Sequence, residues 1–547
     1  MRWALPWLCV WLLSLSVPVS AQLRFGPGYT GRVLSQGPAS RAGAGMTFDP
    51  GGGLWVTNIL DHAIRRLNPR TGAILEEVGF DQGVRTPDDV VFGSDGTMYW
   101  TNFLSGDVGK RTPDGTASFI GNVGEGADGI AVFPDGRLFV GRFLVGDELF
   151  EIDPAGVQPP RLVASGLVGL EGLDAGPDGG VYAAMIFTGE VIRVDRDSGA
   201  VSVFASGLDQ PIAVRFGPDG ALYVLEYLTG RVLRLRHANA TPELVATTDV
   251  GVDGLDFDPA GVLYTSNWVN GRVERIRHGR RATVVEGGLV AAGGLAVTGH
   301  GWHTRVWSAE VSTLRSTGAA LGEQRDVFPT VFNDGTAALS LPFTVAPHGD
   351  DLVTTSWFAN AVQVIDRETG ALVSAHLDFA APMNAVSFRG DLVVAEAGTG
   401  EVVRFDPVSG QRHTIGSGLA LPIGLAADDR SLFAADWGTG TVWALAANGR
   451  PLSAPRVRAT DLLAPEGMAL GRDGTLYVCE TGRNRVVALD RSGRRTVVVS
   501  RLPAGIPAVE GFLPTWTLCD VALDAAGLIY VSVPGANQIL QIREDCR

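Results

Sequence analysis

Four carboxylates occupy one position of a pattern that recurs along the first half of this 547-residue chain. Each stands eight residues before a turn glycine, at the start of an apolar strand: Asp88, Asp128, Glu171 and Asp253. The two other repeats carry Ala44 and Ile212 at this position. Carboxylates packed around one narrow channel repel one another and lose solvation, so they must be protonated or neutralised by a cation. Ca²⁺, which several oxygen ligands satisfy at flexible geometry, is the candidate.

The recurring pattern is a (D/E)G pair, an apolar strand, a glycine-containing turn and a second apolar strand, repeated about twelve times. Clear copies are ADGIAVFPDGRLFVGRF from Ala127 and PEGMALGRDGTLYVCET from Pro465. A third strand and a short fourth strand follow, as in GEVIRVD from Gly189 and VSVFAS from Val201. Four antiparallel strands about every 40 to 45 residues predict the blade of a β-propeller.

The repeat count predicts an all-β protein with two tandem six-bladed β-propellers, each closed by its own N-terminal strand. The propellers span residues 29–278 and 280–547, with the boundary near Gly279. In this prediction Gly31 to Ser35 complete the blade that contains Val273 to Ile276, and Thr283 to Glu286 complete the last blade.

Composition excludes one class of partner and indicates a compartment. The net charge of −15 and the lack of a basic patch argue against nucleic acid. Residues 1–21 have a cationic start, a short apolar run and a small-residue end, which predicts a cleaved signal peptide. No later stretch is long and apolar enough for a membrane helix. We therefore expect a secreted or periplasmic protein, outside the membrane, whose partner is a small molecule or peptide, or a protein bound on a propeller face.

A second set of side chains should reach the same channel mouth as the carboxylates. In a propeller blade the first strand starts at the face where the second strand ends. The ends of the second strands carry Asn58, Asn102, Arg142, Met185, Glu226 and Asn267. We predict that Asn102, Arg142, Glu226 and Asn267 bind substrate, with Arg142 either orienting an anion or pairing with a neighbouring acid.

The second propeller differs at both positions. Its inner-strand starts read Gly293, Phe343, Met383, Ile423, Glu466 and Cys519, a largely apolar throat. Its second strands end at Glu310, Ser356, Glu396, Asp436, Glu480 and Ser532. This acidic rim is either a ligand site or a set of hydrogen-bonding groups between blades. The mature chain keeps an odd number of cysteines, Cys479, Cys519 and Cys546, so at least one is free or pairs with another chain.

The segment TPDDVVFGSDGTMYWTN from Thr86, with LEGLDAGPDG and PEGMALGRDG, resembles SMP-30/gluconolactonase and NHL-repeat propellers, and more distantly virginiamycin B lyase. The lactonase resemblance implies one divalent ion in the channel, held by Glu, Asn and Asp at the inner-strand starts, with an acid as general base. By position the matches are Glu171, Asp128, Asp253 and Asp88, although no Asn stands there. No His occupies either set of mouth positions, so the His–Glu arrangement of the lyase does not carry over.

Three functions follow as hypotheses. The first is a metal-dependent hydrolase of lactone or ester type, or a lyase, with Asp128 and Glu171 as catalytic residues and Asp88, Asp128, Glu171 and Asp253 as ligands of Ca²⁺. The alternative is a non-catalytic scaffold that binds a protein, peptide or carbohydrate, in which the acids are solvated or bond loop amides. The third is an accessory protein of periplasmic oxidoreductases, which only fold and location support.

Overall fold

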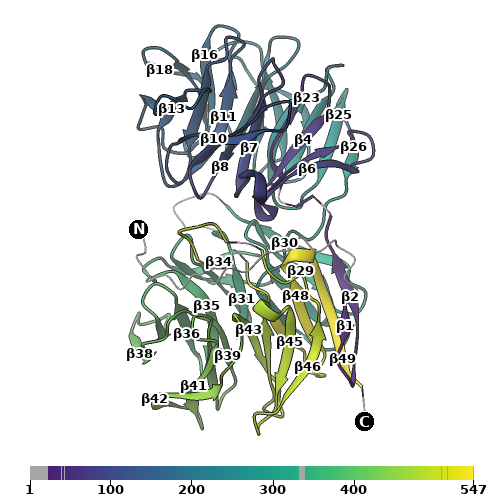
Figure 1. Ribbon diagram of the computed structural model, residues 1–547, viewed down its shortest axis with the longest axis vertical. Helices are drawn as coiled ribbons and strands as arrows, with labels where there is room; N and C mark the ends of the chain where they lie inside the picture. Colours follow the sequence, from purple (N-terminus) through teal and green to yellow (C-terminus); the bar gives the residue numbers. More distant parts are fainter. Residues whose placement is uncertain are drawn as a thin grey trace. The chain divides into compact units, whose positions relative to one another are not determined.

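The computed structural model describes residues 23–38, 40–41, 43–331, 339–506, 508–513, 515 and 517–545 (Figure 1). They form β-strands and five short 3₁₀ helices, so the all-β prediction is confirmed. The 3₁₀ helices are η1 (Ile59–Asp61), η2 (Phe80–Gln82), η3 (Gly301–His303), η4 (Thr481–Arg483) and η5 (Pro534–Ala536). The predicted signal peptide and Cys546 lie outside the described residues.

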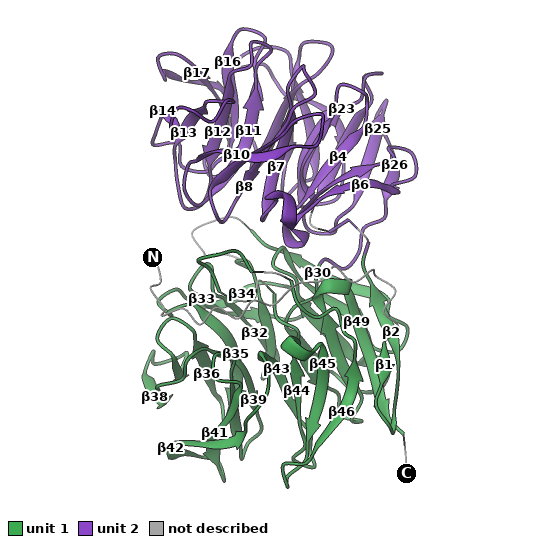
Figure 2. Cartoon of the chain, viewed as in Figure 1, with its two compact units in different colours: residues 1–37, 291–547 green, residues 38–290 purple. Residues whose placement is uncertain are grey.

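The chain divides into two compact units, coloured in Figure 2. Unit 2 is Pro38–Val290, and unit 1 combines Met1–Gly37 with Ala291–Arg547. Unit 2 is therefore inserted into the sequence of unit 1, between its first strands and the rest of its sheets. Unit 2 corresponds to the first predicted propeller and holds the four carboxylates.

Unit 2 contains six four-stranded antiparallel sheets within the described residues. They are β3 (Gly43–Phe48), β4 (Leu54–Asn58), β5 (Ala63–Leu67) and β6 (Ile74–Val78); β7 (Pro87–Phe92), β8 (Met98–Asn102), β9 (Asp107–Arg111) and β10 (Ala117–Asn122); β11 (Ala127–Val132), β12 (Leu138–Arg142), β13 (Leu149–Ile152) and β14 (Arg161–Ala164); β15 (Leu170–Ala175), β16 (Gly180–Met185), β17 (Glu190–Asp195) and β18 (Val201–Ala205); β19 (Pro211–Phe216), β20 (Leu222–Glu226), β21 (Arg231–Leu235) and β22 (Glu243–Thr247); β23 (Val252–Phe257), β24 (Leu263–Asn267), β25 (Val273–Arg277) and β26 (Arg280–Val285).

The described part of unit 1 also forms six sheets. They are β27 (Leu295–Thr298), β28 (Arg305–Ala309), β29 (Thr313–Gly318) and β30 (Gln324–Pro329); β31 (Thr344–His348), β32 (Asp351–Ser356), β33 (Ala361–Asp366) and β34 (Leu372–His376); β35 (Pro382–Phe388), β36 (Asp391–Glu396), β37 (Glu401–Phe405) and β38 (Arg412–Gly416); β39 (Pro422–Ala427), β40 (Leu432–Asp436), β41 (Thr441–Ala447) and β42 (Arg450–Ala459); β43 (Pro465–Leu470), β44 (Leu476–Glu480), β45 (Arg485–Leu489) and β46 (Arg495–Ser500), extended by β1 (Arg24–Phe25); β47 (Val521–Leu523), β48 (Ile529–Val533) and β49 (Gln538–Glu544), completed by β2 (Tyr29–Gln36).

The first strands of successive sheets contact one another in order within each unit. In unit 2 the order is β3, β7, β11, β15, β19 and β23, and β23 contacts β3 again. In unit 1 it is β27, β31, β35, β39, β43 and β47, and β47 contacts β27. Four-stranded sheets that meet through their first strands are consistent with β-propellers.

The strands predicted to close each propeller are wrong. Gly31 to Ser35 lie in β2, which pairs with β49 at the end of the chain and not with the blade of Val273 to Ile276. Thr283 lies in β26, which pairs with β25 of its own sheet and not with the last blade. The reason is the turn before β26, where His278 and Gly279 both have positive φ, at 50° and 72°. Two such residues make a tight hairpin, so the chain turns straight back along β25 at the point where the sequence suggested a domain boundary.

In unit 2 the first and last sheets each consist of four consecutive strands, and they meet without a strand from elsewhere in the chain. Met46 and Leu54 of the first sheet pack with Tyr264 and Val273 of the last in one buried cluster. Asp256 of β23 accepts hydrogen bonds from the Phe48 backbone N–H at 2.8 Å and from the Thr47 hydroxyl at 3.0 Å. Apolar packing and the hydrogen bonds to Asp256 thus join the two sheets, in place of the closing strand that the sequence predicted.

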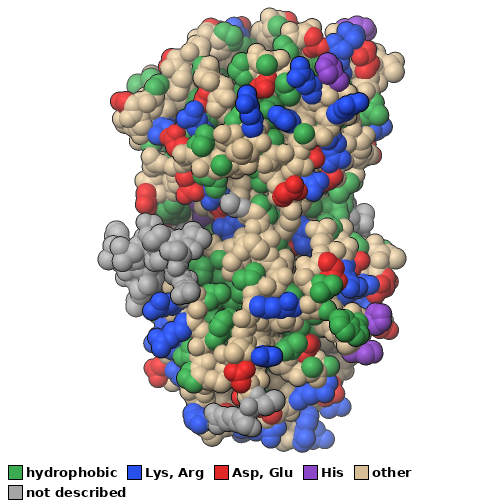
Figure 3. Space-filling view, turned by 90° about the vertical axis from the view of Figure 1, so that its right-hand side faces the viewer, with side chains coloured by type: hydrophobic (Ala, Val, Ile, Leu, Met, Phe, Trp, Pro, Cys, Tyr) green, Lys and Arg blue, Asp and Glu red, His purple; other side chains and the backbone are tan. Residues whose placement is uncertain are grey.

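On the side shown in Figure 3, Lys and Arg side chains are interspersed with Asp and Glu. Among the described residues no helix is long and apolar enough to cross a membrane.

Candidate functional site

A β-bulge at the start of the inner strands positions the four carboxylates. In β7, Pro87 pairs with Asn102, but the next pair joins Val90 to Trp100, so β7 has one more residue than β8 across this step. The same irregularity encloses Asp128 in β11, Glu171 in β15 and Asp253 in β23. A bulge frees a residue from the regular ladder and redirects its side chain. The (D/E)G pairs of the sequence lie in these bulges.

The glycine after the acid allows neighbouring inner strands to approach closely. A Cβ on Gly172 would lie 2.8 Å from the carbonyl oxygen of Ile212, and one on Gly254 would lie 2.6 Å from that of Ala44. Both partners are backbone atoms of the adjacent sheet, which cannot move aside as a side chain could. The glycine therefore sets the spacing at which the acidic strand starts converge.

Hydroxyl groups of the second strands hold some of these strand starts in place. The Thr57 hydroxyl donates to the carbonyl oxygen of Asp88 at 2.5 Å, and the Thr101 hydroxyl donates to that of Asp128 at 2.6 Å. The Ser266 hydroxyl donates to the carbonyl oxygen of Ala44 at 2.6 Å, from the last sheet to the first. Each bond runs from one sheet to the next, so the position of each of these strand starts depends on the preceding sheet.

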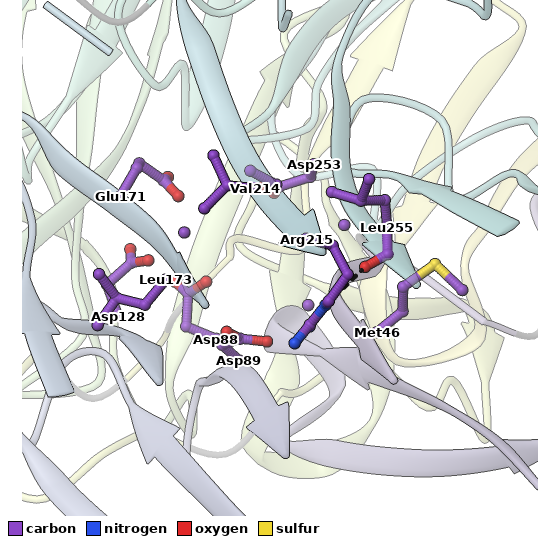
Figure 4. Close-up of a pocket in the computed structure, with 14 residues that line it drawn as sticks. Met46, Asp88, Asp89, Asp128, Glu171, Leu173, Val214, Arg215, Asp253 and Leu255 are labelled. Carbon is purple, nitrogen blue, oxygen red and sulfur yellow. Dashed lines mark hydrogen bonds between the residues drawn. The ribbon is translucent and has the colours of Figure 1, made fainter. Parts of the chain in front are cut away.

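The structure brings all four predicted metal ligands to one cavity (Figure 4). Its volume is about 20 Å³, enough for one ion or one water molecule. Asp128 and Glu171 are 2% and 7% exposed, whereas Asp88 and Asp253 keep part of their surface open. The carboxyl groups of Asp88 and Glu171 both lie near that of Asp128 in this cavity. Because an ionised carboxylate only accepts hydrogen bonds, two such groups can hydrogen-bond to each other only when one of them carries a proton.

Burial dominates the electrostatics of this cluster. It raises the pKa of Asp88, Asp128 and Glu171 well above their ordinary values, and the neighbouring carboxylates raise them further. Burial raises the pKa of Asp253 to about 7, with a further contribution from Asp89. The protein without a bound cation therefore holds protons in this cluster near neutral pH.

The sequence analysis missed a second group of charged side chains beside the acidic cavity. We call it the charged layer: Asp89, Asp174, Arg215 and Asp256. Arg215 of β19 has Nη1 3.2 Å from Asp174 Oδ1 and Nε 3.7 Å from Asp256 Oδ1. Burial raises the pKa of Asp89 to about 6, and Arg215 acts in the opposite direction. Asp174 and Asp256 stand three residues after Glu171 and Asp253, so the shared string (E/D)GLD was the signal.

This layer links neighbouring sheets through backbone N–H groups. Asp174 accepts from Phe216 at 2.6 Å, and Asp89 accepts from Ile130 at 3.2 Å. Arg215 also lines the acidic cavity, but its ion pairs are with Asp174 and Asp256 and not with the four carboxyl groups. Tyr227, fully buried after β20, was also missed: burial raises the pKa of its hydroxyl well above the ordinary value, and Asp253 and Glu171 add to that shift.

The four predicted substrate-binding residues are engaged inside their own sheets. Asn102 Oδ1 accepts from the Arg85 N–H, and Glu226 Oε1 accepts from the Asp209 N–H. Asn267 donates to the Val250 carbonyl oxygen and accepts from the N–H of Val269. These side chains fix the loop that leads into the inner strand. A role in substrate binding stays a prediction.

Arg142 takes the second of its two predicted roles. Its Nη1 lies 2.8 Å from Glu148 Oε2, and its Nε donates to the Glu125 carbonyl oxygen at 3.0 Å. This pair lies within one loop and does not involve the acidic cavity.

The same positions in unit 1 form a different environment. Met383 and Ile423 are 1% and 0% exposed. Glu466 accepts from the Cys519 N–H at 2.8 Å, and burial raises its pKa to about 7. The rim acids act as loop anchors: Glu396 accepts from the Ala380 N–H at 2.9 Å. This rim contact is a hydrogen bond, as the second interpretation of the sequence proposed, but it joins β36 to the loop before β35 of the same sheet and does not run between blades.

The acidic cavity offers the oxygen donors that a hard cation prefers, but its side chains are not arranged around an ion in this structure. Its carboxyl oxygens are the donors that Ca²⁺ prefers. Within the described ranges, however, no group of three or more His, Cys, Asp or Glu side chains is arranged so that it could hold a metal ion. Cation binding would require these carboxyl groups to be ionised and to turn toward the ion.

Comparison with known proteins gives similar structures at low similarity. No protein-family model matches the chain, and no curated protein matches it. Among solved structures it is similar to a streptogramin B lyase, with 13% identity over 60% of this chain and 94% of the other and a TM-score of 0.36. It is also similar to a protein assigned as a gluconolactonase, with 15% identity over 49% and 99% and a TM-score of 0.37. A third is the extracellular domain of a hybrid two-component system from B. thetaiotaomicron, with 10% identity over 95% and 82% and a TM-score of 0.32. The first two are structure types that the repeat motifs resemble, and at this level none of the three carries an argument about activity.

Proposed function

We propose that unit 2 is a closed six-bladed propeller whose channel binds one divalent cation, Ca²⁺, at Asp88, Asp128, Glu171 and Asp253. The observation that carries the proposal is the convergence of four carboxyl groups on one small cavity, whose basic lining residue Arg215 makes its ion pairs with Asp174 and Asp256. A cation of two charges offsets the repulsion and the lost solvation that otherwise keep these groups protonated.

On this proposal the protein is a metal-dependent hydrolase of lactone or ester type, or a lyase, acting at the channel mouth. A bound divalent ion would polarise a carbonyl oxygen and lower the pKa of water. Asp128 and Glu171, the most deeply buried acids of the cluster, would exchange a proton with the substrate, and the bound ion would keep them ionised and able to accept it.

We also propose that the protein is exported to the periplasm or beyond the cell. The support is the cationic and apolar character of residues 1–21. Extracellular calcium modules need only weak affinity, with Kd values of roughly 10⁻⁴ to 10⁻³ M. A site whose carboxyl groups must first lose protons suits such a compartment.

Two observations favour a second function, a non-catalytic scaffold stabilised by the ion. The cavity of about 20 Å³ has no room for a substrate. The predicted substrate-binding side chains are occupied by loop contacts, as Asn102 and Glu226 show. In this function a protein, peptide or carbohydrate binds a propeller face and the acids serve only the ion.

Calcium binding is tested first, by isothermal titration of the full chain after treatment with EDTA at pH 7.5. We expect one Ca²⁺ per chain, lost in Asp128→Asn and in Glu171→Gln. The matched control is Glu466→Gln, which changes a buried acid at the same position of unit 1 and should leave binding intact. The proposal fails if the folded wild type gives neither heat nor thermal shift with Ca²⁺, Mg²⁺, Mn²⁺ or Zn²⁺.

Turnover is tested separately, with lactones and aryl esters in the presence and absence of EDTA. Hydrolysis that requires the ion and disappears in Glu171→Gln supports the enzyme. Calcium binding without turnover of any of these substrates supports the scaffold.

A further inference from the structure

Unit 1 contains a pair of buried cysteines whose sulfur atoms meet. Cys479 is in β44, and Cys519 lies two residues before β47 in the next sheet. The two Sγ atoms are 2.8 Å apart, closer than unbonded sulfur atoms normally pack. Both side chains are fully buried.

We propose that Cys479 and Cys519 form a disulfide that joins the last two sheets of unit 1. The bond forms by thiol–disulfide exchange with an oxidising protein disulfide or low-molecular-weight disulfide. One sulfur–sulfur bond of the oxidant breaks, the Cys479–Cys519 bond forms, and the two thiol protons pass to the two thiols released from the oxidant. The assignment leaves Cys546 as the unpaired cysteine of the predicted mature chain.

The position of this cross-link would let it stabilise the last sheet of unit 1. The sheet of β47, β48 and β49 is completed by β2, from the opposite end of the chain. Its fourth strand is therefore not consecutive in sequence with the other three, and its β47 lies against β27 of the first sheet. A covalent bond to β44 restrains the sheet at which unit 1 would otherwise open. Cys479 and Cys519 also belong to one apolar cluster with Val531 and Leu540, so the link runs through packed core.

In the reduced protein the thiols would have hydrogen-bonding partners of their own. The folded protein could therefore hold the pair either as thiols or as a disulfide. Cys519 Sγ lies 3.1 Å from the Ser532 carbonyl oxygen, to which its S–H can donate. Burial raises the pKa of both thiols, so neither becomes a thiolate readily in the folded protein. Because exchange needs a thiolate and access, the redox state set during folding persists in the native protein.

Peptide mapping of the wild type tests the proposal directly. The full chain is expressed in the bacterial periplasm, alkylated under denaturing conditions without reductant, and digested. We expect one linked peptide containing Cys479 and Cys519, and an alkylated Cys546. Recovery of both cysteines as alkylated thiols, or of either one linked to Cys546, overturns the proposal.

Thermal unfolding separates the cross-link from the packing of the sulfur atoms. We expect the Tm of unit 1 to be roughly 5 to 10 °C higher for wild type refolded with an oxidised thiol buffer than with a reducing one. The double variant Cys479→Ala/Cys519→Ala loses the packing in both buffers and should show equal Tm values. Cys546→Ser should behave as wild type. Equal Tm values for the wild type in the two buffers contradict the proposal.

Discussion

Replacing Asp253 by Asn removes an ionisable group from the acidic cavity and keeps the shape of the neutral acid. Burial raises the pKa of Asp253 to about 7 in the folded protein. In the unfolded chain the pKa of an aspartic acid is about 3.9. The folded state therefore binds the proton more tightly, and the stability this provides is complete below about pH 4. It is lost as the pH rises through about 7.

The size of the effect follows from these two values. A difference of about three pH units between the folded and unfolded pKa corresponds to about 4 kcal/mol of unfolding free energy. About 1.5 kcal/mol of this is already lost at pH 5, so about 3 kcal/mol separates pH 5 from pH 8. We expect metal-free Asp253→Asn to gain about this much stability over the wild type between those two pH values.

The assay is urea unfolding of the full chain in EDTA at pH 5 and pH 8, read by pulsed hydrogen exchange and mass spectrometry. Peptides from β23 and β15 report unit 2 separately from unit 1, which a single spectroscopic signal cannot do. At pH 8, added Ca²⁺ should stabilise unit 2 of the wild type and have no such effect on Asp253→Asn.

One result refutes this reasoning: unit 2 of the metal-free wild type is as stable at pH 8 as at pH 5. The carboxyl groups would then ionise without cost, and the argument for a required cation would fail. A stability gain in Asp253→Asn that is equal at both pH values would point instead to relief of local strain.

Three further changes test how the sheets are joined. Deleting residues up to Gln36 removes β2 and should expose the edge of β49, so unit 1 unfolds at lower urea concentration while unit 2 does not change, as hydrogen exchange can show. In metal-free protein at pH 5, Asp256→Ala should destabilise unit 2 by about 1 to 3 kcal/mol in urea unfolding, because the partly buried Phe48 N–H loses its acceptor. An unchanged unfolding midpoint would rule out this link between the first and last sheets. Gly172→Ala should destabilise unit 2 by about 1 to 3 kcal/mol, because the new Cβ would contact the Ile212 carbonyl oxygen. The control Gly79→Ala, where a Cβ meets no atom within 4 Å, should not destabilise it. Equal losses of stability in the two variants would contradict the close approach of the inner strands.

The sequence predicted the features that each repeat contains within itself. Turn glycines and alternating strands marked the four strands of a blade, and counting from the turn placed Asp88 and Glu171 at equivalent sites, which the structure brings to one cavity. It failed where the outcome depended on two repeats at once. Nothing within Gly31 to Ser35 says that its partner is β49, because every outer strand has similar alternation.

The charged layer was missed for a related reason. Asp174 and Asp256 look like ordinary strand residues, and only the approach of Arg215 from a third sheet shows their function. Asn102 and Glu226 were placed correctly at the ends of their strands, but the backbone N–H groups that they bind come from a loop whose path the sequence does not specify.

The two units together show that the acids of unit 2 are not a requirement of the fold. At equivalent inner-strand starts, unit 1 buries Met383 and Ile423, and its sheets still meet in the same order through their first strands. Apolar residues at this position stabilise by burial, whereas buried carboxyl groups cost free energy at neutral pH. Unit 2 nevertheless places four of them around one cavity. A ligand that binds their charged forms would recover that free energy, and the divalent cation that we propose is small enough for a cavity of about 20 Å³.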